Sequence, residues 1–577
     1  MSSKISRLRS KIIFPKSASP AFGQRAALIL LLLVGAVFLM RIMTPDDLGG
    51  RDQVRVCAYI LDAAYNNNWL CQVDSYGDVA SKPPFYNWLG ALMVVLFGAH
   101  RFAFALPAFF GTLLAVWAVW RWTIDLTSDE RSGWLAILCY LTTNAVVRQT
   151  ALVRTDGLFT GFTALCAWQA WRAWETDQGW WRAWFLAALG ALTKGPFALL
   201  LGFGGLFAVF WNRRTTPYKG LSRSWWQGMV LPLILAGGWA LAAWLVMGPA
   251  FYDKIFVQEL WDQSVGDSMD ISRLFLSLRP PLYLLSRALP WTPLFIWALW
   301  NIFRHPASEA EERRGERFLV AHIGIGLLAL MLAQHKRGDL IFPLLPAVAV
   351  LEGRMLGLWS RAWHWPKLKT ILAVFTGLFV LTEVWYLAVP RTDRKDDVLG
   401  RDNKAFAEKL ETQCGAFFPF SFAACHDLQY RLGVTRLTLQ PARILKLLAG
   451  QEAIFIVTED LPDLISSLPA GLTYYVLARD TKRPYGVISN RSQWEAGPDM
   501  VVSAGTWELH THGAVIRRMR GTTAWIDPAP GEGQVTLNNF STRPCTLWLV
   551  LPNGKYRKIH AGAGASFTIA TADMRLD

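Results

Sequence analysis

The sequence predicts a polytopic α-helical membrane protein of about 11–13 spans, followed by a soluble C-terminal domain. Hydrophobic residues make up 53% of the 577 residues, and charged residues only 18%. Apolar runs able to cross a hydrocarbon layer of about 30 Å recur from 24–43 to 369–389. Residues 391–577 are mixed and polar, contain no such run, and suffice to bury a core of their own. The chain therefore divides near residue 390.

The net charge of +15 is most simply explained by basic cytoplasmic loops and anionic lipids. We therefore expect the lipid bilayer, and no nucleic acid, among the partners of the chain. No small-residue cleavage site follows the first apolar run, which favours a span over a removable signal. We expect a monomer.

Eleven segments of the first part are candidate spans. In chain order they are 24–43, 102–120, 132–147, 157–174, 182–193, 196–211, 226–248, 280–302, 317–334, 339–357 and 369–389. The pair 182–193 and 196–211 is short and is interrupted by TKGP at 193–196. This pair could tilt or re-enter the membrane. We expect residues 24–390 to form one transmembrane catalytic domain.

The distribution of positive charge sets the orientation in the membrane. The N-terminal segment 1–23 is basic, which indicates a cytoplasmic start. The other basic loops are 212–225, 303–316 and 358–369. All three are cytoplasmic only if the apolar stretch 85–98 does not cross the membrane. Its length, about 14 residues, also suits an interfacial helix within a long outer loop, 44–101.

This topology places the C-terminal domain on the outer side of the membrane, which is the periplasm for a bacterial inner membrane. The outer segments are then 44–101, 148–156, 249–279 and 335–338. In an oxidising compartment two disulfides are possible, Cys57 with Cys71 and Cys414 with Cys425. No CxxC pair or histidine cluster indicates a structural zinc site.

The C-terminal domain, 391–577, reads as an α/β unit of about 391–495 and a β module of about 496–577. The segments that carry these patterns are a helix at 402–414, a strand and capped helix at 453–468, a strand at 473–479, and alternating stretches at 500–510 and 545–552. None has a catalytic signature. A folding module is therefore favoured over a surface that grips substrate or a partner.

Ionisable side chains gather at the outer ends of the predicted spans. Asp52 follows the first span, Arg55 lies one helical turn on, and Lys82 belongs to the same loop. The others are Arg148, Arg154, Asp156, Lys194, Lys336 and Arg337. Carboxylates suit deprotonating a hydroxyl or stabilising positive charge at an anomeric carbon. Lys and Arg suit a phosphate, including a leaving phosphate, and a lipid-linked phosphate would lie at this depth.

Each of these groups has a plainer explanation when it is taken alone. Lys82 could be a snorkelling lysine at a helix end, and Arg154 with Asp156 an ordinary surface ion pair. Two prolines follow Lys82 and hold the chain extended, which fixes the direction of its ammonium group. The common position of all the groups on one predicted face favours a site.

The pattern resembles the C-type glycosyltransferases, in the branch of the bacterial lipid A aminoarabinose transferase and the protein O-mannosyltransferases. The motifs are the Asp52–Arg55 pair, KPP at 82–84 before an amphipathic helix, and Asp156 in the second outer loop. Further matches are 191-ALTKGPFALLL-201, 279-RPPLYLLSRALPWTPL-294 and 335-HKRGDLIFPLLPAVAVLEG-353. The motifs occur in the order of the family and span about 20–390.

The resemblance implies transfer of a sugar, with inversion, from a polyprenyl phosphate to an acceptor at the outer membrane face. The implied catalytic carboxylates are Asp52, as base or orienting group, and Asp156, in contact with acceptor or sugar. The implied ligands of the donor phosphate are Lys82, Arg55, Lys194, Lys336 and Arg337. Arg154 and Arg148 are the expected acceptor or sugar contacts.

Two departures from the family concern a metal. Members often have Asp-Glu where this chain has Asp52-Gln53, and Glu-Lys-Pro-Pro where it has Ser81 before Lys82. Both changes remove a carboxylate, so a divalent metal is in doubt and we assign no metal ligand. An acceptor that is already ionised, such as a lipid A phosphate, would also need no strong base.

The leading hypothesis is therefore an enzyme that glycosylates a glycolipid such as lipid A from an undecaprenyl phosphate donor. Transfer to protein hydroxyls is the nearest alternative. A transporter or flippase for an anionic lipid would place ionisable residues in mid-span. The span centres are almost free of charge, which favours the enzyme. A scaffold that uses its outer domain for envelope assembly is the remaining class.

Overall fold

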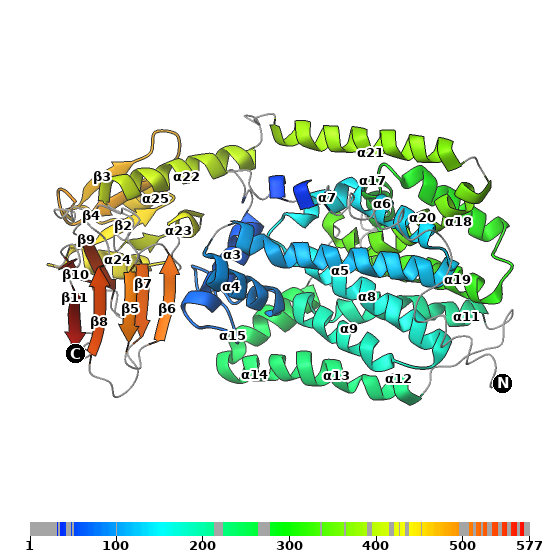
Figure 1. The fold of residues 1–577 in the computed structure, drawn as a ribbon. Helices are drawn as coiled ribbons and strands as arrows, with labels where there is room; N and C mark the ends of the chain where they lie inside the picture. Colours follow the sequence, from blue (N-terminus) through cyan, green and yellow to red (C-terminus); the bar gives the residue numbers. More distant parts are fainter. Residues whose placement is uncertain are drawn as a thin grey trace.

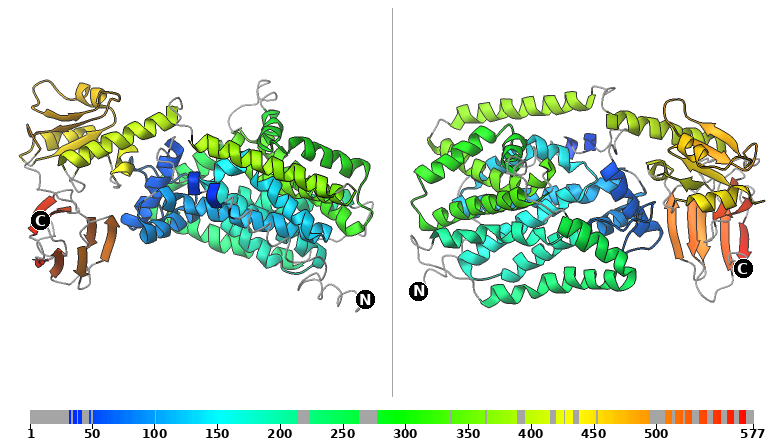
Figure 2. Two further views of the ribbon diagram at one scale, coloured as in Figure 1. Left: turned by 45° about the horizontal axis from the view of Figure 1, so that its top comes forward. Right: turned by 180° about the vertical axis from the view of Figure 1, so that it is seen from behind.

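The protein is a long helical bundle with a smaller, strand-containing unit at one end (Figure 1). The computed structural model describes residues 51–99, 101–212, 223–262, 277–334, 337–362, 365–388, 395–414, 420–425, 427–432, 438–451 and 453–494, a few residues between 32 and 48, and seven strands between 507 and 570. Figure 2 shows the same division from two other sides. Helix α22 (Lys395–Cys414) leads from the bundle into the end unit.

Apolar helices make up the bundle. Four described helical segments are long and apolar enough to cross a membrane, namely Arg101–Thr127, Ser224–Met247, Ala310–Leu332 and Gly338–Ser360. Shorter apolar helices are Phe85–Phe97, Phe197–Trp211 and Ala373–Trp385. The prediction of a polytopic helical membrane protein is confirmed at this level. The predicted first span, 24–43, lies almost entirely outside the described residues.

The bundle helices follow one another with short connections. They are α5 (Arg101–Thr127), α6 (Glu130–Leu141), α7 (Asn144–Thr150), α8 (Thr155–Thr176), α9 (Trp180–Lys194), α10 (Phe197–Phe203), η1 (Gly204–Phe207), α11 (Ala208–Asn212), α12 (Arg223–Gly228), α13 (Val230–Pro232), η2 (Leu233–Gly237), α14 (Gly238–Met247), α15 (Pro249–Tyr252), η3 (Asp253–Asp262), α17 (Arg279–Arg287), α18 (Thr292–Arg304), α19 (Ala310–Leu332), η4 (Gly338–Leu344), α20 (Leu345–Ala362) and α21 (Trp365–Ala388).

Helices α5 and α8 lie against each other at the centre of the bundle, and glycines make this contact possible. A Cβ atom on Gly111 would lie 2.3 Å from the carbonyl oxygen of Gly157, and one on Gly161 would lie 2.4 Å from that of Gly111. Small residues of this kind let two membrane helices approach backbone to backbone. The contact holds the first turn of α8, which carries Asp156, against α5.

The outer loop predicted at 44–101 contains two helices, α3 (Arg51–Tyr65) and α4 (Phe85–Phe97). Helix α4 turns one face to the protein, where the Tyr86 hydroxyl donates a hydrogen bond to the Phe104 carbonyl at 3.0 Å. The exposed residues of its opposite face are Leu92, Val95, Leu96 and Phe97. An exposed apolar face opposite a packed one is what a helix at a membrane interface requires.

The predicted span 280–302 is not one helix. Two helices, α17 and α18, replace it, and Pro290 lies between them. Proline lacks the N–H that an α-helix needs and its ring clashes with the preceding turn, so the helix ends here. The predicted span 339–357 likewise starts as the 3₁₀ segment η4 before α20 begins at Leu345. These two irregular points lie side by side, since η4 packs on α17.

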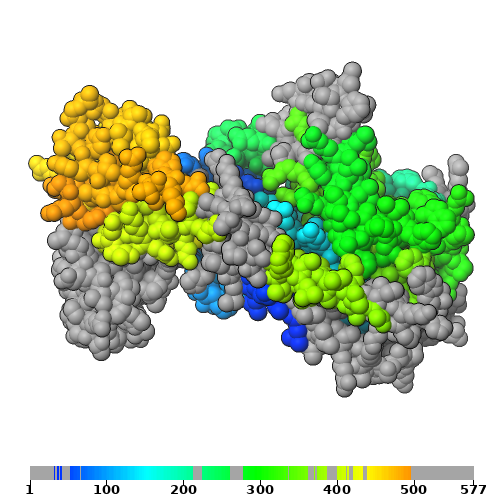
Figure 3. Space-filling view, turned by 90° about the horizontal axis from the view of Figure 1, so that it is seen from above, coloured from blue at the N-terminus to red at the C-terminus, as the bar shows by residue number. Residues whose placement is uncertain are grey.

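The end unit contains a four-stranded sheet in the order β1-β2-β4-β3, with β1 and β2 parallel and the other neighbours antiparallel. Its elements are α22, β1 (Ser421–Ala423), α23 (Asp427–Arg431), α24 (Pro441–Leu448), β2 (Phe455–Thr458), α25 (Leu461–Ser466), β3 (Tyr475–Arg479) and β4 (Gly486–Ser489). The predicted strand and capped helix at 453–468 are β2 and α25, with Asp460 as the N-cap that accepts from the Asp463 N–H. Figure 3 shows this unit beside the bundle, seen from above.

The last strands form antiparallel pairs. They are β5 (Trp507–Thr511), β6 (Val515–Arg520), β7 (Thr523–Asp527), β8 (Gln534–Asn539), β9 (Cys545–Val550), β10 (Tyr556–Ala561) and β11 (Ser566–Ala570). Strand β8 lies between β11 and β5, while β6 pairs with β7 and β9 with β10. The end unit touches the outer loop where the Thr438 N–H donates to the Ser75 carbonyl at 2.7 Å.

The disulfides considered from the sequence do not form in this structure. Cys71 and Cys425 both carry free thiols, so neither the Cys57–Cys71 nor the Cys414–Cys425 bridge is present. Burial raises the pKa of the Cys71 thiol to about 11, which disfavours its reactive thiolate.

Candidate active site

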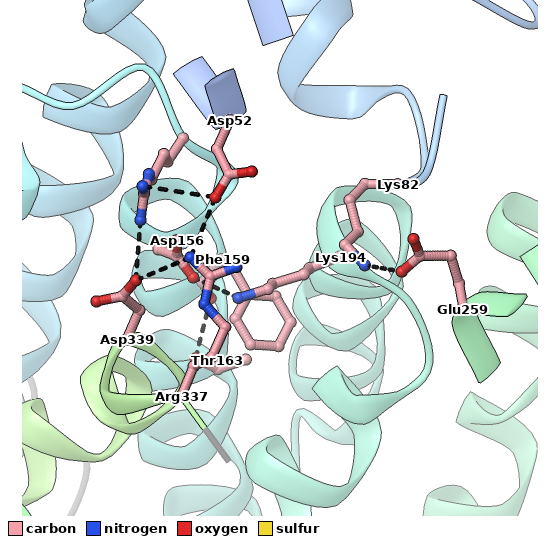
Figure 4. A network of polar contacts seen from close by, with 10 residues as sticks. Asp52, Lys82, Asp156, Phe159, Thr163, Lys194, Glu259, Arg337 and Asp339 are labelled. Carbon is pink, nitrogen blue, oxygen red and sulfur yellow. Dashed lines mark hydrogen bonds and ion pairs between the residues drawn. The ribbon is translucent and has the colours of Figure 1, made fainter. Parts of the chain in front are cut away.

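Asp52 is the centre of a network of four charged side chains (Figure 4). It lies in the first turn of α3, and its Oδ2 accepts a hydrogen bond from Arg337 Nη2 at 3.1 Å. Arg154 Nη2 lies 3.6 Å from the same oxygen. Both guanidinium groups also contact Asp339 Oδ2, Arg154 at 2.9 Å and Arg337 at 3.5 Å. Two carboxylates and two guanidinium groups therefore balance one another.

The network keeps Asp52 ionised. Burial alone would raise the pKa of the carboxyl. The hydrogen bond from Arg337 and the positive charges of Arg154, Arg337 and Arg55 outweigh it and lower this pKa below its ordinary value. A carboxylate with a lowered pKa is a weak proton acceptor at neutral pH. The geometry therefore suits orienting a substrate or stabilising positive charge better than removing a proton from a hydroxyl.

Asp156 and Lys194 form a second pair. Asp156 lies in the first turn of α8 and Lys194 in the last turn of α9, and the ammonium group donates to Asp156 Oδ1. The Lys194 Nζ also lies 5.7 Å from the centre of the Phe159 ring. Asp156 is buried, whereas its partner is partly exposed. The closeness of α8 and α9 thus places a cation and a carboxylate together below Asp52.

Lys82 pairs with a residue that the sequence did not single out. Its ammonium group donates to Glu259 Oε2, and one third of the Lys82 side chain is exposed, at 33%. Glu259 lies on the π-helical segment η3, within the outer segment expected at 249–279. Lys82 itself precedes Pro83 and Pro84, and Pro84 caps α4. The prolines and α4 therefore hold Lys82 at one border of the site, as Figure 4 shows.

Arg55 and Gln53 attach α3 to its surroundings. Arg55 Nε lies 3.9 Å from Asp74 Oδ2, and this nitrogen is buried without a hydrogen bond among the described residues. Gln53 Oε1 accepts from the Val153 N–H at 2.9 Å. This bond ties the turn that carries Asp52 to the segment directly before Arg154. At the position where family members often carry a glutamate, the Gln53 side chain is therefore engaged in a hydrogen bond with a backbone N–H.

The remaining predicted site residues lie at the edge or outside the description. Arg148, on α7, is exposed and lines a small cavity with Arg287 and Asp339. Lys336 lies outside the described residues. Asp339, Glu259 and Arg287 are the site residues that the sequence reasoning missed. A signal existed for the first, since Asp339 directly follows Arg337 and Gly338 in a segment that had been noted.

A metal site is not apparent in the part of the chain that the structure describes. No group of three or more His, Cys, Asp or Glu side chains there could hold an ion. The carboxylates of the site are instead paired with lysine and arginine.

Residues 81–241 match the protein family described as dolichyl-phosphate-mannose-protein mannosyltransferase. Two curated relatives were found. One is an uncharacterised protein of Aquifex aeolicus, 23% identical over 355 residues, with 56% of this chain and 66% of the relative covered. The other is the undecaprenyl phosphate-alpha-4-amino-4-deoxy-L-arabinose arabinosyl transferase of Pseudomonas savastanoi, 25% identical over 337 residues, with 55% and 60% covered. The chain thus spans less than two thirds of the length of either relative.

The solved structure of ArnT from Cupriavidus metallidurans bound to undecaprenyl phosphate superimposes with a TM-score of 0.63 at 16% identity. It covers 80% of this chain and 98% of that chain. The chain has the fold of the C-type glycosyltransferases. The apo form of the same ArnT gives a TM-score of 0.61 at 17% identity, with 81% and 99% covered.

The C-type resemblance predicted from the sequence is therefore confirmed. The predicted enzyme class, a glycosyltransferase, is supported by the same matches. The family match begins at Ser81 and includes Lys82, Asp156 and Lys194. Asp52 and Arg337 lie outside it, so their place in the site rests on the geometry described above.

Proposed function

We propose that the chain is an inverting glycosyltransferase that moves a sugar from undecaprenyl phosphate, or another polyprenyl phosphate, to a glycolipid such as lipid A. The observation that carries the proposal is the ionised Asp52 held between two arginines, with two lysines nearby. The similarity to the arabinosyl transferase and to ArnT bound to undecaprenyl phosphate supports the donor class.

Lys82 and Lys194 are proposed to bind the donor phosphate, together with Arg55, Arg337 and Lys336. Each of the two lysines now pairs with one carboxylate, and Lys82 remains partly exposed to solvent. A phosphate that carries more negative charge than a carboxylate could replace Glu259 and Asp156 in some of these contacts with the lysines. As the bond to the sugar breaks, negative charge grows on the leaving phosphate, and fixed cations stabilise this charge more than that of the intact donor.

Asp52 is proposed to act on the sugar side of the bond that breaks. Its negative charge would stabilise the positive charge that develops at the anomeric carbon, and it would orient the incoming acceptor. Asp156 would contact the sugar or acceptor once Lys194 turns to the phosphate. A single displacement from the face opposite the phosphate inverts the anomeric centre.

An ionised acceptor agrees best with the lowered pKa of Asp52. A phosphate oxygen needs no deprotonation, whereas a protein hydroxyl holds its proton at neutral pH and requires a base. The protein-glycosylating alternative remains the second candidate, because the matching family is described as a protein mannosyltransferase. The lowered pKa of Asp52 disfavours it.

The proposal includes an arrangement in the bacterial inner membrane. The segment 1–23 would be cytoplasmic, and the site, α4 and the C-terminal domain 391–577 would lie on the outer, periplasmic side. The exposed apolar residues of α4, in its last two turns, support placing this helix, which follows Lys82, at a membrane surface. The protein would act as a monomer.

The test is a transfer reaction with purified protein in lipid nanodiscs. A synthetic undecaprenyl-phosphate sugar is offered with a phosphorylated glycolipid or with a serine- and threonine-containing peptide, and products are identified by mass spectrometry. We expect a glycolipid product with inverted configuration. A peptide product alone would establish the alternative, and the absence of any sugar transfer would contradict both.

Chelation with EDTA tests the metal in the same assay. We expect transfer to persist, because neutral Gln53 and Ser81 stand where family members often carry carboxylates. Loss of transfer that returns with added Mg²⁺ or Mn²⁺ would show a metal requirement.

A further inference from the structure

A small cavity opens beside the Asp52 network, on the side away from Lys82. Its lining comes from three elements that are distant in sequence, α7, α17 and η4. The lining residues are Ala145, Arg148, Gln149, Arg287, Gly338, Asp339, Phe342 and Leu345. Its enclosed volume, about 10 Å³, is that of one water molecule, so a whole sugar is excluded and a group such as a phosphate would lie at its mouth.

The charges around this cavity do not cancel. Asp339 belongs to the lining, but its carboxylate is matched within the network by Arg154 and Arg337, which also match Asp52. Arg148 and Arg287 remain, and neither makes an ion pair with any residue that the structure describes. Two uncompensated guanidinium groups that face one cavity are an arrangement suited to a phosphate.

The position of Arg287 is set by the absence of a side chain opposite it. A Cβ atom on Gly338 would lie 3.2 Å from Arg287 Nη2 and 3.4 Å from its Nε. The guanidinium group therefore packs on the backbone that precedes Asp339. A methyl group at Gly338 would have to move it by a few tenths of an ångström or more.

A buried acceptor completes the cavity. The Gln149 side chain is 7% exposed, and its Oε1 has no hydrogen-bond partner among the described residues. A buried amide oxygen without a donor is costly to the fold. A hydroxyl or a singly protonated phosphate at the cavity would supply the missing donor while the arginines hold its charge.

We propose that this cavity is the binding site for the phosphate group of the acceptor glycolipid, and that Arg148, Arg287 and Gln149 recognise it. The inference rests on the proposed function and deepens it, because it selects an anionic acceptor. Lys82 and Lys194 hold the donor phosphate on one side of Asp52, the acceptor phosphate lies on the Asp339 side, and Arg337 contacts both carboxylates between them. The carboxylate of Asp52 then lies between two anions that are each bound by their own cations.

Binding and transfer are measured separately, so that the two proposals can fail separately. Native mass spectrometry of the full chain in detergent compares binding of a monophosphorylated glycolipid with that of its dephosphorylated form. We expect the wild type to prefer the phosphorylated form. The double substitution Arg148→Gln and Arg287→Gln should weaken this form by about 10- to 100-fold and leave the dephosphorylated form unchanged.

Two further variants refine the test. Gly338→Ala should change the same preference in the same direction but less, since it displaces Arg287 without removing its charge. Arg304→Gln, an exposed arginine at the far end of α18, is the matched control and should change nothing. Inorganic phosphate serves as competitor: displacement of the glycolipid at millimolar concentration would assign the site to free phosphate rather than to a lipid headgroup.

The results distinguish failure of the acceptor site from failure of the proposed reaction. Equal loss for both glycolipid forms, or no loss in the double variant, would overturn the acceptor site whatever the transfer assay gives. If binding behaves as expected but no sugar is transferred, the site stands as a lipid-phosphate site and the proposed reaction fails. In the transfer assay, the double variant should raise the acceptor KM while the donor KM stays constant.

Discussion

Each end of helix α8 carries a carboxylate that pairs with a cation from another helix, but the surroundings of the two pairs differ in exposure. At its first turn, Asp156 meets Lys194 beside the half-exposed network of Asp52. At its last turn, Glu175 accepts two hydrogen bonds from Arg314, at 2.7 and 2.6 Å. Glu175 lies nineteen positions after Asp156, which corresponds to a rise of roughly 28 Å along the helix.

At the distal end, the carboxylates are matched by guanidinium groups that are mostly buried. Arg354, only 5% exposed, donates to Glu312 at 2.8 Å and also pairs with the fully buried Glu316. Glu316 in turn accepts from the Ala307 N–H at 3.0 Å. At the outer end, by contrast, the Asp52 and Arg337 side chains are 48% and 46% exposed, and Arg148 and Arg287 lack a charged partner among the described residues.

The charge networks at the two ends of the bundle therefore differ in what they could offer a ligand. Buried ion pairs that match carboxylates with guanidinium groups hold helices in place and leave no cation for a ligand. Exposed pairs with surplus cations can exchange one partner for a ligand. Substitutions at the two ends should therefore affect different quantities.

The largest effect is expected for Asp52→Asn. This change keeps the shape but removes the negative charge, so sugar transfer should fall by about 10²- to 10⁴-fold while donor binding persists. The measurement is the transfer rate of nanodisc-embedded protein at saturating donor. A folded variant that retained full transfer would show that Asp52 has no part in the reaction.

Arg354→Met should affect stability instead of the reaction. Removal of one partner leaves Glu316 buried without its cation, at a cost of about 3–5 kcal/mol in the free energy of unfolding. A thermal unfolding scan in detergent should show a lower Tm. The rate of transfer per folded molecule should stay that of the wild type, and a selective loss of rate would mean that the two ends of α8 are coupled.

Lys82→Gln is expected to weaken the donor selectively. It removes one charged contact with the phosphate, which should raise the apparent donor KM by about 10- to 100-fold. The acceptor KM provides the internal comparison and should not change. Glu259→Gln should have the opposite, smaller effect, because it frees the Lys82 ammonium for the phosphate. An unchanged donor KM in Lys82→Gln would contradict the phosphate role.

The smallest effect concerns pH. The pKa of Asp52 is lowered from 3.8, so the carboxylate stays charged until the pH falls through this lowered value. Transfer that depends on the charge should thus persist above this value and be lost below it. Arg337→Gln removes a hydrogen bond and a charge, which raises the pKa of Asp52 and moves the acid limb of the pH–rate profile to higher pH. If the acid limb did not move, the pH dependence of transfer would not arise from the titration of Asp52.

The sequence was sufficient to single out some of the cations and carboxylates, such as Lys82, Arg154 and Asp156, but not their partners or Arg287. Membrane spans confine charged residues to their ends, so Lys82, Arg154 and Asp156 stand out in the sequence. The pairs that they form join positions 177 and 185 residues apart, Lys82 with Glu259 and Arg154 with Asp339. Such pairing depends on how whole helices pack, which no local pattern in a single sequence contains.

Two expectations from the sequence needed physical correction. The span 280–302 is divided at Pro290, a break that proline itself signals. The bundle interior also holds more ionisable groups than expected, because Glu352 of α20 and His322 of α19 are almost fully buried. Each lies in a segment that is otherwise mostly apolar, so the segment still reads as a membrane span. The helix α4 beginning just after Lys82 could be anticipated, since an apolar run too short to cross is readable in sequence.

The contact of Gly111 with Gly157 and Gly161 determines where the first turn of α8 lies. Arg154 and Asp156 belong to the same end of α8 as Gly157, so the positions of these two charged groups depend on how closely the backbones of α5 and α8 approach each other. A methyl group added at this crossing would collide with the backbone of α8 and displace the end of the helix that carries these groups. Alanine at Gly111 should therefore produce the phenotype of a catalytic mutant, although this position contributes no chemical group.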